Sequence, residues 1–287
     1  MSKIRIVTDS TADLPEELVK QYGIEVVSLK VHFGEEVYDD RWLEPDVFYD
    51  KLVKASKLPT TSQPSPMDFL EVYKKLNETP GTQIISIHLS AAFSGTYQSA
   101  VLAKSMLEEE ADITIIDSKS ASYGLGMLVE EAAKAAESGK SKEEIIDLVQ
   151  NLRSSTKLYF LVDTLEYLHK GGRIGKASAV FGSLLNIKPI LSIDDDGEVY
   201  AVDRIRGQKR AMHRIIELLK KDFAMDKPVV VHMAYADNKE TAEELGNMVR
   251  EQFIVHRYVY TRIGSVIGTH AGTGVIAVFM SPLMESE

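Results

Sequence analysis

The first half of the chain alternates between two hydrophobic patterns. Short β-branched runs, which are typical of buried strands, are separated by segments whose apolar residues recur at helical spacing. The predicted strands are Lys3–Val7, Glu25–Val31, Gln83–His88 and Asp112–Asp117. The predicted helices are Pro15–Tyr22, Pro66–Leu76, Gly95–Glu109, Gly124–Ser138 and Lys142–Arg153. Asp13 and Glu16 have the spacing of a capping box at the start of the first helix. Strands that alternate with helices predict βαβ units and a parallel sheet flanked by helices.

The second half of the chain carries the signal of an antiparallel hairpin. The turn sequence Asp-Asp-Asp-Gly at residues 194–197 separates the apolar runs Pro189–Ile193 and Val199–Arg204. The other predicted elements are the strands Leu158–Val162, Val229–Met233, Arg257–Arg262 and Val275–Phe279 and the helices Gln208–Lys221 and Lys239–Gln252. Because a hairpin does not fit a purely parallel sheet, we expect two α/β domains, residues 1–155 and 156–287, with a mixed sheet in the second.

Composition and charge limit the classes of function. The chain has 287 residues, of which 44% are hydrophobic and 26% charged, as is normal for a globular protein with a core. A net charge of −10 argues against nucleic acid as a partner. No apolar run approaches the roughly 20 residues that a membrane span needs. The chain has no cysteine, and its start lacks the apolar core of a signal peptide. We therefore expect a cytoplasmic monomer without stable membrane insertion.

Small hydroxylated residues cluster where the predicted strands end. They occur in residues 8–11, 60–65, 90–99 and 118–122. In an open α/β sheet, ligands bind beyond the carboxyl ends of the strands. Helix capping alone explains any one of these loops. Ser94-Gly95-Thr96 goes further, because glycine lets a ligand approach the backbone and a helix start offers N–H groups. Together the loops predict a site for a small anion, such as a carboxylate or a phosphate.

Two glycine-rich segments of the second half are further candidates. His270 lies among four glycines in residues 264–274, which we expect to form a loop between two strands. Arg173 lies in a basic Gly-Gly turn, which is either a solvated turn or a site for an anion or partner. Signals for other chemistry are missing from the sequence: there is no P-loop, no Gly-x-Gly-x-x-Gly after the first strand, no Gly-x-Ser-x-Gly around Ser94 and no histidine pair at metal-ligand spacing.

Seven motifs in the same order resemble the DegV family of bacterial fatty-acid-binding proteins. They are TDSTADLP (8–15), TTSQPSP (60–66), SGTYQSA (94–100), IDSKSAS (116–122), LEYLHKGGRIGKA (165–177), LLNIKPIL (184–191) and IGTHAGTG (267–274). The resemblance covers nearly the whole chain. It implies two α/β domains with the ligand between them. It also implies a long-chain fatty acid such as palmitate as that ligand, no other cofactor, and a role in lipid transport or fatty acid metabolism.

The resemblance assigns the head group of this ligand to hydroxyls of the first half. Thr61, with Ser62 beside it, and Ser94 are implied to hold the carboxylate. The N–H groups of Gly95 and Thr96 are available to satisfy it further. A carboxylate that leaves water costs several kcal/mol unless it is hydrogen-bonded. Neutral donors at these positions meet that cost without a fully buried ion pair.

Residues of the second half are implied to support the head group and a partner. By resemblance, His270 supports the head group and Arg173 lies near the head-group end. Some family members are carrier subunits of a fatty acid kinase, and Arg206 resembles a basic position used towards that kinase. The family usually has His-x-Gly-Pro-Gly where this chain has Thr273 in place of the proline.

Three alternatives remain open beside this expectation. The first is a serine hydrolase with Ser94 as nucleophile and His270 as base, oriented by Asp9, although the spacing carries no signature of such an enzyme. The second is a domain that handles a phosphorylated or small carbonyl ligand. The third is a regulatory protein that binds no lipid. The absence of catalytic signatures favours a binding protein that is not an enzyme.

Overall fold

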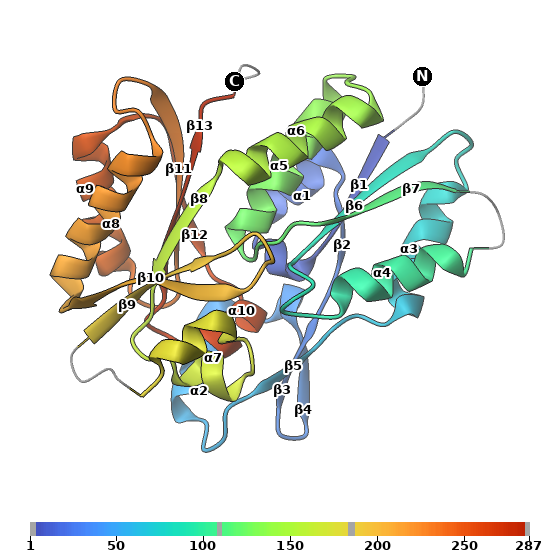
Figure 1. Ribbon diagram of the computed structural model, residues 1–287. Helices are drawn as coiled ribbons and strands as arrows, with labels where there is room; N and C mark the ends of the chain where they lie inside the picture. The colour runs from blue at the N-terminus through green and yellow to red at the C-terminus, as the bar shows by residue number, and fades with distance from the viewer. Residues whose placement is uncertain (1–3, 108–110, 183–186, 285–287) are drawn as a thin grey trace. The chain divides into compact units, whose positions relative to one another are not determined.

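The chain forms two compact units (Figure 1). The computed structural model describes residues 4–107, 111–182 and 187–284. Unit 1 consists of residues 1–44 and 59–154, and unit 2 of residues 45–58 and 155–287. The sequence-based division at residue 155 placed residues 45–58 in the first domain. In the structure this segment belongs to unit 2.

Helix α2 (Pro45–Lys54) belongs to unit 2 because its apolar face packs there. Phe48 and Tyr49 are buried, and the Tyr49 hydroxyl donates to the carbonyl of Ile263 at 3.0 Å. Both rings pack against Gly268 of helix α10 (Ser265–Ala271), where a Cβ atom would lie 2.6 Å from the Tyr49 hydroxyl oxygen. An amphipathic pattern shows that a helix is covered, but not by which part of the chain.

Unit 1 is built on a parallel sheet, as predicted. Its strands are β1 (Ile4–Asp9), β2 (Glu25–Val27), β6 (Gln83–His88) and β7 (Asp112–Asp117), in the order β2-β1-β6-β7. Helices α3 (Pro66–Asn77) and α4 (Thr96–Ser105) pack on one side of the core, which includes Phe69, Tyr73 and Ile84. The remaining helices of this unit are α1 (Glu16–Tyr22), α5 (Tyr123–Glu137) and α6 (Lys142–Ser155). The carboxyl ends of all four strands therefore lie at one edge of the sheet.

A second, antiparallel sheet of unit 1 was not predicted. It consists of β3 (Lys30–Phe33), β4 (Glu36–Asp39) and β5 (Thr60–Ser62), in the order β4-β3-β5. The single strand predicted at Glu25–Val31 is divided in the structure between β2 and β3. Residues 60–62, which we expected to be a loop, are a strand because they pair with β3.

The predicted capping box at Asp13 and Glu16 is wrong. Asp13 has a left-handed backbone with φ of 50° and ends the short 3-10 helix Ser10–Ala12, and Pro15 precedes α1 without a side-chain cap. The structure instead forms a capping box at the start of α3, where the side chains of Ser65 and Asp68 bond each other's backbone.

Unit 2 contains a six-stranded mixed sheet, as predicted. Its strands, in spatial order, are β10 (Val199–Arg206), β9 (Ile187–Ile193), β8 (Lys157–Leu161), β13 (Ile276–Pro282), β11 (Pro228–Tyr235) and β12 (Ile254–Arg262). Only the β11–β12 pair is parallel among these described strands. The β9–β10 hairpin turns at Gly197, whose φ of 85° suits glycine. The mixed sheet therefore separates this unit from the parallel type of unit 1.

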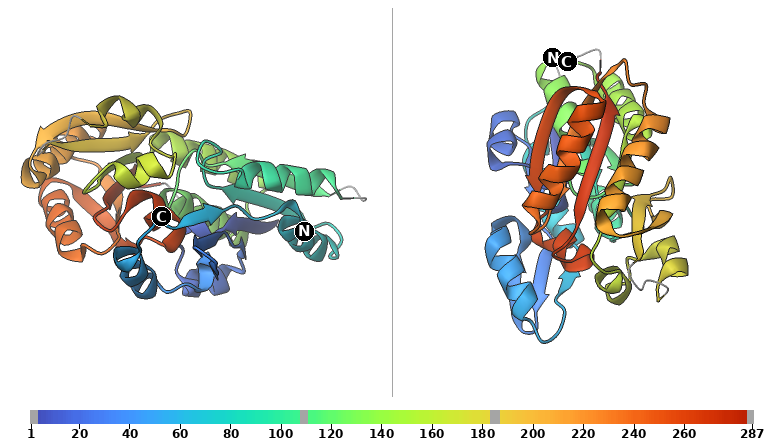
Figure 2. Two further views of the ribbon diagram at one scale, coloured as in Figure 1. Left: turned by 90° about the horizontal axis from the view of Figure 1, so that it is seen from below. Right: turned by 90° about the vertical axis from the view of Figure 1, so that its left-hand side faces the viewer.

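Four α-helices and one 3-10 helix complete the described part of unit 2 beside α2. Helices α8 (Gln208–Asp222) and α9 (Lys239–Gln252) pack against each other and against the sheet (Figures 1 and 2). Helix α7 (Glu166–Lys170) follows β8, and a 3-10 helix follows it at Gly175–Val180. Residues 264–274, which we expected to be a loop, contain helix α10, so His270 lies in a helical last turn. None of the helices in the described residues is long and apolar enough to cross a bilayer.

Candidate functional site

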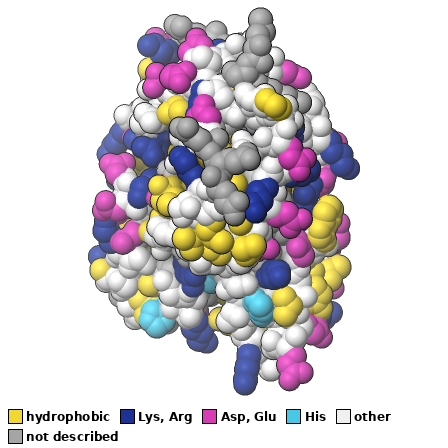
Figure 3. Space-filling model, turned by 90° about the vertical axis from the view of Figure 1, so that its right-hand side faces the viewer, with side chains coloured by type: hydrophobic (Ala, Val, Ile, Leu, Met, Phe, Trp, Pro, Cys, Tyr) yellow, Lys and Arg dark blue, Asp and Glu magenta, His cyan; other side chains and the backbone are white. Residues whose placement is uncertain are grey.

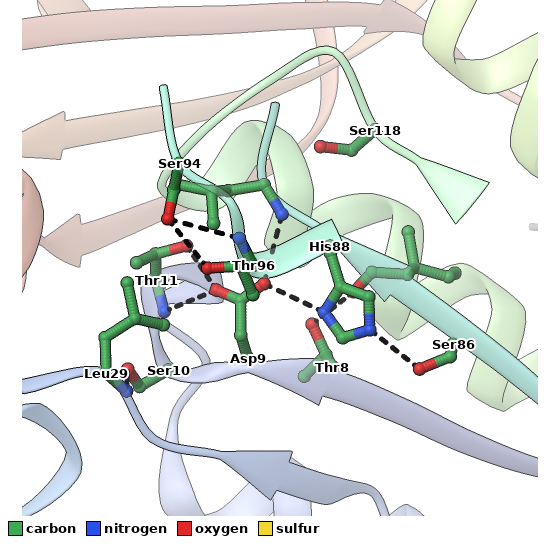
Figure 4. A network of polar contacts seen from close by, with 12 residues as sticks. Thr8, Asp9, Ser10, Thr11, Leu29, Ser86, His88, Ser94, Thr96 and Ser118 are labelled. Carbon is green, nitrogen blue, oxygen red and sulfur yellow. Dashed lines mark hydrogen bonds and ion pairs between the residues drawn. The ribbon is translucent and has the colours of Figure 1, made fainter. Parts of the chain in front are cut away.

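The carboxylate of Asp9 organises the edge of the unit 1 sheet. Asp9 is the last residue of β1 and is fully buried. One carboxylate oxygen accepts the backbone N–H and the hydroxyl of Thr11, and the other accepts the N–H of Leu89 at 3.0 Å. The second oxygen also lies 3.0 Å from Nδ1 of His88 (Figure 4). The hydrogen bonds of the Asp9 carboxylate therefore hold the end of β1 against the end of β6.

A buried relay continues from Asp9 into the core of unit 1. His88 Nε2 lies 2.7 Å from the Ser86 hydroxyl, which lies 2.8 Å from the Tyr73 hydroxyl. Burial raises the pKa of Tyr73, so this hydroxyl remains protonated. Asp9, His88 and Ser86 have the residue types of a hydrolase triad, but all three are fully buried. The relay therefore lies inside unit 1 and supports the loops from within.

The predicted anion loop at the start of α4 is partly satisfied from within. The Ser94 hydroxyl lies 2.9 Å from the Thr96 hydroxyl and accepts the Thr96 N–H at 3.3 Å. The Gly95 N–H donates to Oε1 of Gln63 at 3.0 Å. Both N–H groups that we expected to face a carboxylate therefore have acceptors in the protein. The half-buried Ser94 hydroxyl is the group of this loop best placed to reach a ligand.

The structure separates the two hydroxyls of strand β5 that the sequence treated together. Thr61 is paired with the buried Val31, whereas Ser62 is paired with Lys30. Successive residues of a strand point to opposite faces of its sheet, so these side chains diverge. The Ser62 hydroxyl lies 2.9 Å from Nε2 of His32. Ser62 therefore serves the small sheet, and Thr61 is the candidate for a ligand.

Three residues in loops at the carboxyl edge of unit 1 have left-handed backbones without being glycine. They are Asp13, Lys119 and Ser122, with φ of 50°, 54° and 52°. The hydroxyl of Ser122 donates to the Asp13 carboxylate at 2.5 Å and joins two of these positions. Each such residue costs on the order of 1–3 kcal/mol and persists only where the surrounding structure fixes it. The loops around the candidate site are therefore rigidly defined.

Unit 2 brings the predicted residues His270 and Arg173 together. A Cβ atom on Gly171 would overlap the imidazole of His270, so only glycine permits this approach. Arg173 donates to the carbonyl of the same Gly171 at 2.6 Å. Burial, reinforced by the charge of Arg173, lowers the pKa of His270 to about 4. His270 is therefore neutral near pH 7 and lies beside a permanent positive charge.

The glycines of residues 264–274 allow close packing around His270. A Cβ atom on Gly272 would lie 2.5 Å from the Tyr167 ring, and one on Gly274 would overlap the Asp163 carboxylate. Gly272 also has φ of 83°, which few other residues adopt. This glycine-rich sequence therefore encodes a tight joint between α10 and the segment that follows β8.

A family model described as "Uncharacterised protein, DegV family" matches residues 3–283 of the chain. The chain belongs to the DegV family. The α/β fold with a parallel sheet and a mixed sheet, which the sequence motifs predicted, is confirmed by solved structures of other DegV proteins.

Three similar solved structures cover essentially the whole chain. A DegV family protein from Thermus thermophilus, described by its fatty acid binding, is 35% identical and covers 99% of this chain and 100% of its own, with a TM-score of 0.91. DegV from Bacillus subtilis, described as a fatty acid binding protein, is 35% identical with the same coverage and a TM-score of 0.88. A stearic acid-binding protein from Eubacterium ventriosum is 29% identical, with 98% coverage of both chains and a TM-score of 0.88.

Sequence reasoning missed three supporting residues of this DegV protein. His88, His32 and Gln63 each bond a candidate residue or its neighbour from a different segment. The position of His88 at the end of a predicted buried strand was a usable signal, because ligands and their supports gather there. Gln63 lies in the motif TTSQPSP, but neither its partner nor that of His32 could be read from the sequence, since these partners lie 32 and 30 residues away.

Proposed function

We propose that this protein binds a long-chain fatty acid and holds it by its carboxylate. The observation that carries this proposal is the match to the fatty-acid-binding protein from Thermus thermophilus, at 35% identity over 99% of the chain. Burial of roughly 15 apolar carbons at ~0.8 kcal/mol each contributes on the order of 12 kcal/mol, which is ample even after the cost of association. Affinity therefore comes mainly from the tail, and the head group contributes orientation and specificity.

In this proposal hydroxyl groups of unit 1 hold the head group. Thr61 and Ser94 donate to the carboxylate, and the Thr96 hydroxyl supports Ser94 at 2.9 Å. The backbone N–H groups of Gly95 and Thr96 have acceptors in the protein, so they act indirectly by fixing Ser94. Ser62 is left out of the direct contacts because its hydroxyl is near His32.

We include His270 and Arg173 as the contribution of unit 2. The positive charge of Arg173 attracts a carboxylate, and the neutral imidazole of His270 can donate one hydrogen bond without adding charge. Their mutual approach across Gly171 supports a joint role. Replacing either residue is expected to weaken binding of a fatty acid more than binding of the corresponding alcohol.

We further propose that the protein is a carrier and not a hydrolase. In the hydrolase alternative, Asp9 orients His270 as the base for Ser94. Asp9 instead accepts hydrogen bonds from Thr11 and Leu89 and pairs with His88. A fluorophosphonate probe is therefore expected to leave Ser94 unlabelled. Labelling of wild type that is lost in Ser94→Ala would favour the hydrolase.

A kinase partner that phosphorylates the bound carboxylate is the third part of the proposal. Arg206 is exposed at the end of β10, within residues 204–221, which hold seven Lys or Arg and one acidic residue in a chain of net charge −10. Such a basic segment suits an acidic partner surface. We expect Arg206→Ala to keep fatty acid affinity while impairing phosphorylation by a cognate kinase. Lys239→Ala, an exposed change on α9, is the control, and equal loss of binding and phosphorylation in Arg206→Ala would contradict this role.

Mass spectrometry of lipid extracted from the purified protein tests the central proposal. We expect a long-chain fatty acid to be recovered, and added palmitate to displace a fluorescent fatty acid. Recovery of a phosphorylated or small carbonyl compound would support the second alternative from the sequence. A protein that carries no lipid and fails to bind palmitate would overturn the proposal.

A further inference from the structure

Gln63 joins the two segments of unit 1 that carry the candidate head-group hydroxyls. It follows β5, two residues after Thr61, and its side chain reaches the start of α4. Its Oε1 accepts the Gly95 N–H at 3.0 Å, and its Nε2 donates to the Ser99 hydroxyl at 3.2 Å. Both ends of one amide are therefore used to tie the strand of Thr61 to the helix that begins beside Ser94.

Gly95 is a glycine because Gln63 is there. Its backbone, with φ of −74° and ψ of 11°, is open to any residue. A Cβ atom at position 95 would lie 2.7 Å from Cδ of Gln63 and closer still to both amide atoms, and these are its three nearest neighbours. The space at Gly95 therefore serves an internal contact, and not the approach of a ligand that we expected from the sequence.

Helix α4 needs such a contact because its apolar pattern does not fix its orientation. Ala100 and Ala103 are buried, but Val101, Leu102 and Met106 are exposed on the outer side. Figure 3 shows apolar side chains on the surface of this side of the molecule. Because apolar residues lie on both the buried and the exposed side of α4, the apolar pattern gives the helix only a weak preference for one buried face. Polar ties remain, namely Gln63 at its start and Lys104, which donates to the Ile113 carbonyl at 2.6 Å, at its end.

We propose that Gln63 is a positioning residue for the head-group site. This inference rests on the proposed function, in which Thr61 and Ser94 donate to the same carboxylate, and Gln63 ties together the segments that carry them. Gln63 itself does not contact the ligand in this role. Loss of the Gln63 hydrogen bonds removes neither hydroxyl, but it lets β5 and α4 move independently. The two hydrogen bonds to the carboxylate are then no longer made together.

Two single variants break the tie from opposite sides. Gln63→Ala removes the amide, and Gly95→Ala expels it while leaving Gln63 in the chain. Each is expected to weaken palmitate binding about threefold to tenfold, the equivalent of one exposed hydrogen bond. Binding of hexadecanol, which has the same tail without a carboxylate, is expected to stay within twofold of wild type. Gln98→Ala, an exposed glutamine in the first turn of α4, is the matched control.

The double variant Gln63→Ala with Gly95→Ala decides whether the two residues act as one. Once the amide is absent, the three atoms nearest to the new Cβ are gone, so the double variant is expected to bind palmitate no more weakly than Gln63→Ala alone. Alanine and glycine at position 95 also differ in helix propensity. This difference is the same with Gln63 and in the Gln63→Ala background, so it cancels in the double-mutant cycle. Losses that multiply, or equal losses for palmitate and hexadecanol, would overturn the positioning role.

The same four proteins separate this inference from the proposed function. Thermal unfolding is expected to show the same non-additivity without any ligand, which tests the contact itself. If wild type binds no palmitate, the proposed function fails, although the unfolding cycle still reports the contact. If wild type binds palmitate and both single variants match it, the proposed function stands and the positioning role is overturned.

Discussion

The glycines at the two candidate regions are crowded by different kinds of neighbour. In unit 1, Gly95 faces the tip of the flexible Gln63 side chain. In unit 2, Gly272 faces the Tyr167 ring, and Gly274 faces Asp163 down to its Cβ atom. A flexible tip can move away at little cost, whereas a packed ring or a short side chain cannot. Crowding at Gly95 can therefore be relieved by movement of one side chain, whereas crowding at Gly272 and Gly274 cannot.

We expect substitutions in the two regions to affect different properties, ligand binding in unit 1 and folding stability in unit 2. Substitutions in the hydroxyl-bearing loops of unit 1 are expected to change ligand binding while the protein stays folded. Substitutions in the glycine-rich joint of unit 2 are expected to unfold or loosen the unit before binding is tested. The following predictions probe this division in order of decreasing effect.

The largest effect is expected from Gly272→Ala. The substitution places a side chain on a backbone with φ of 83° and drives it into the Tyr167 ring. Strain and overpacking together cost about 3–4 kcal/mol of unfolding free energy. Urea unfolding measures this loss. Gly207→Ala, where φ is 87° and a Cβ would meet nothing within 4 Å, isolates the backbone cost at about 1 kcal/mol. Equal losses in the two variants would show that the joint is not crowded.

A smaller but functional effect is expected from Thr61→Val combined with Ser94→Ala. Both changes remove a hydroxyl and nearly preserve shape, so the protein stays folded. The loss of hydrogen bonds to a charged head group weakens palmitate binding by about 2–3 kcal/mol. Calorimetric titration gives this value, with hexadecanol as the uncharged comparison. Unchanged palmitate affinity in the folded variant would remove these two residues from the site.

Acid is expected to destabilise the joint of unit 2 through His270. The pKa of His270 is about 4 in the folded protein, below the ordinary value of 6.5. Between these values the unfolded chain binds a proton that the folded protein does not, so stability is complete above pH 6.5 and falls as pH drops towards 4. The loss from pH 7 to pH 5 is on the order of 2 kcal/mol. Urea unfolding at both pH values, in wild type and His270→Gln, measures it.

The Gln variant is expected to lose less stability between the two pH values than wild type does. Identical losses would show that His270 titrates alike in both states.

The smallest effect is expected from Ser62→Ala. The Ser62 hydroxyl lies near His32 on the face of β5 opposite to Thr61. Palmitate affinity is therefore expected to stay within about twofold of wild type, since no direct hydrogen bond to the ligand is lost. A loss of palmitate affinity as large as that of Thr61→Val alone would show that both hydroxyls reach the ligand. It would contradict the assignment of Thr61 to the ligand and of Ser62 to the small sheet.

The sequence predicted the features that depend on local periodicity. The strands β1, β6 and β7 and the β9–β10 hairpin carry β-branched runs and a turn sequence, and they formed close to the expected residues. It also identified the hydroxyl loops, because the carboxyl ends of parallel strands are a general place for ligands. His270 and Arg173 lie close together within unit 2, and their role at the head group stays a prediction.

Features that depend on distant partners could not be predicted. Residues 60–62 are a strand only because β3 lies alongside, and that pairing decides that Thr61 and Ser62 diverge. The glycine at position 95 looked like an opening for a ligand, since nothing local shows that the Gln63 side chain fills the space. Helix α10 was not predicted, because the glycines in and around it lower helix propensity. The same glycines permit the close packing that stabilises this helix.

Because α2 belongs to unit 2, it is synthesised long before the residues that it packs against. The bond from the Tyr49 hydroxyl to the Ile263 carbonyl spans 214 residues. At a synthesis rate of ~5–20 residues per second, the ribosome reaches residue 263 roughly 10–40 seconds after residue 49. During this interval α2 exists without its partner, and the side chains of Phe48 and Tyr49 lack the contacts that bury them in the folded protein. Unit 2 therefore cannot complete its packing around α2 until residue 263 has been made, whereas every residue of unit 1 is present once residue 154 has been made.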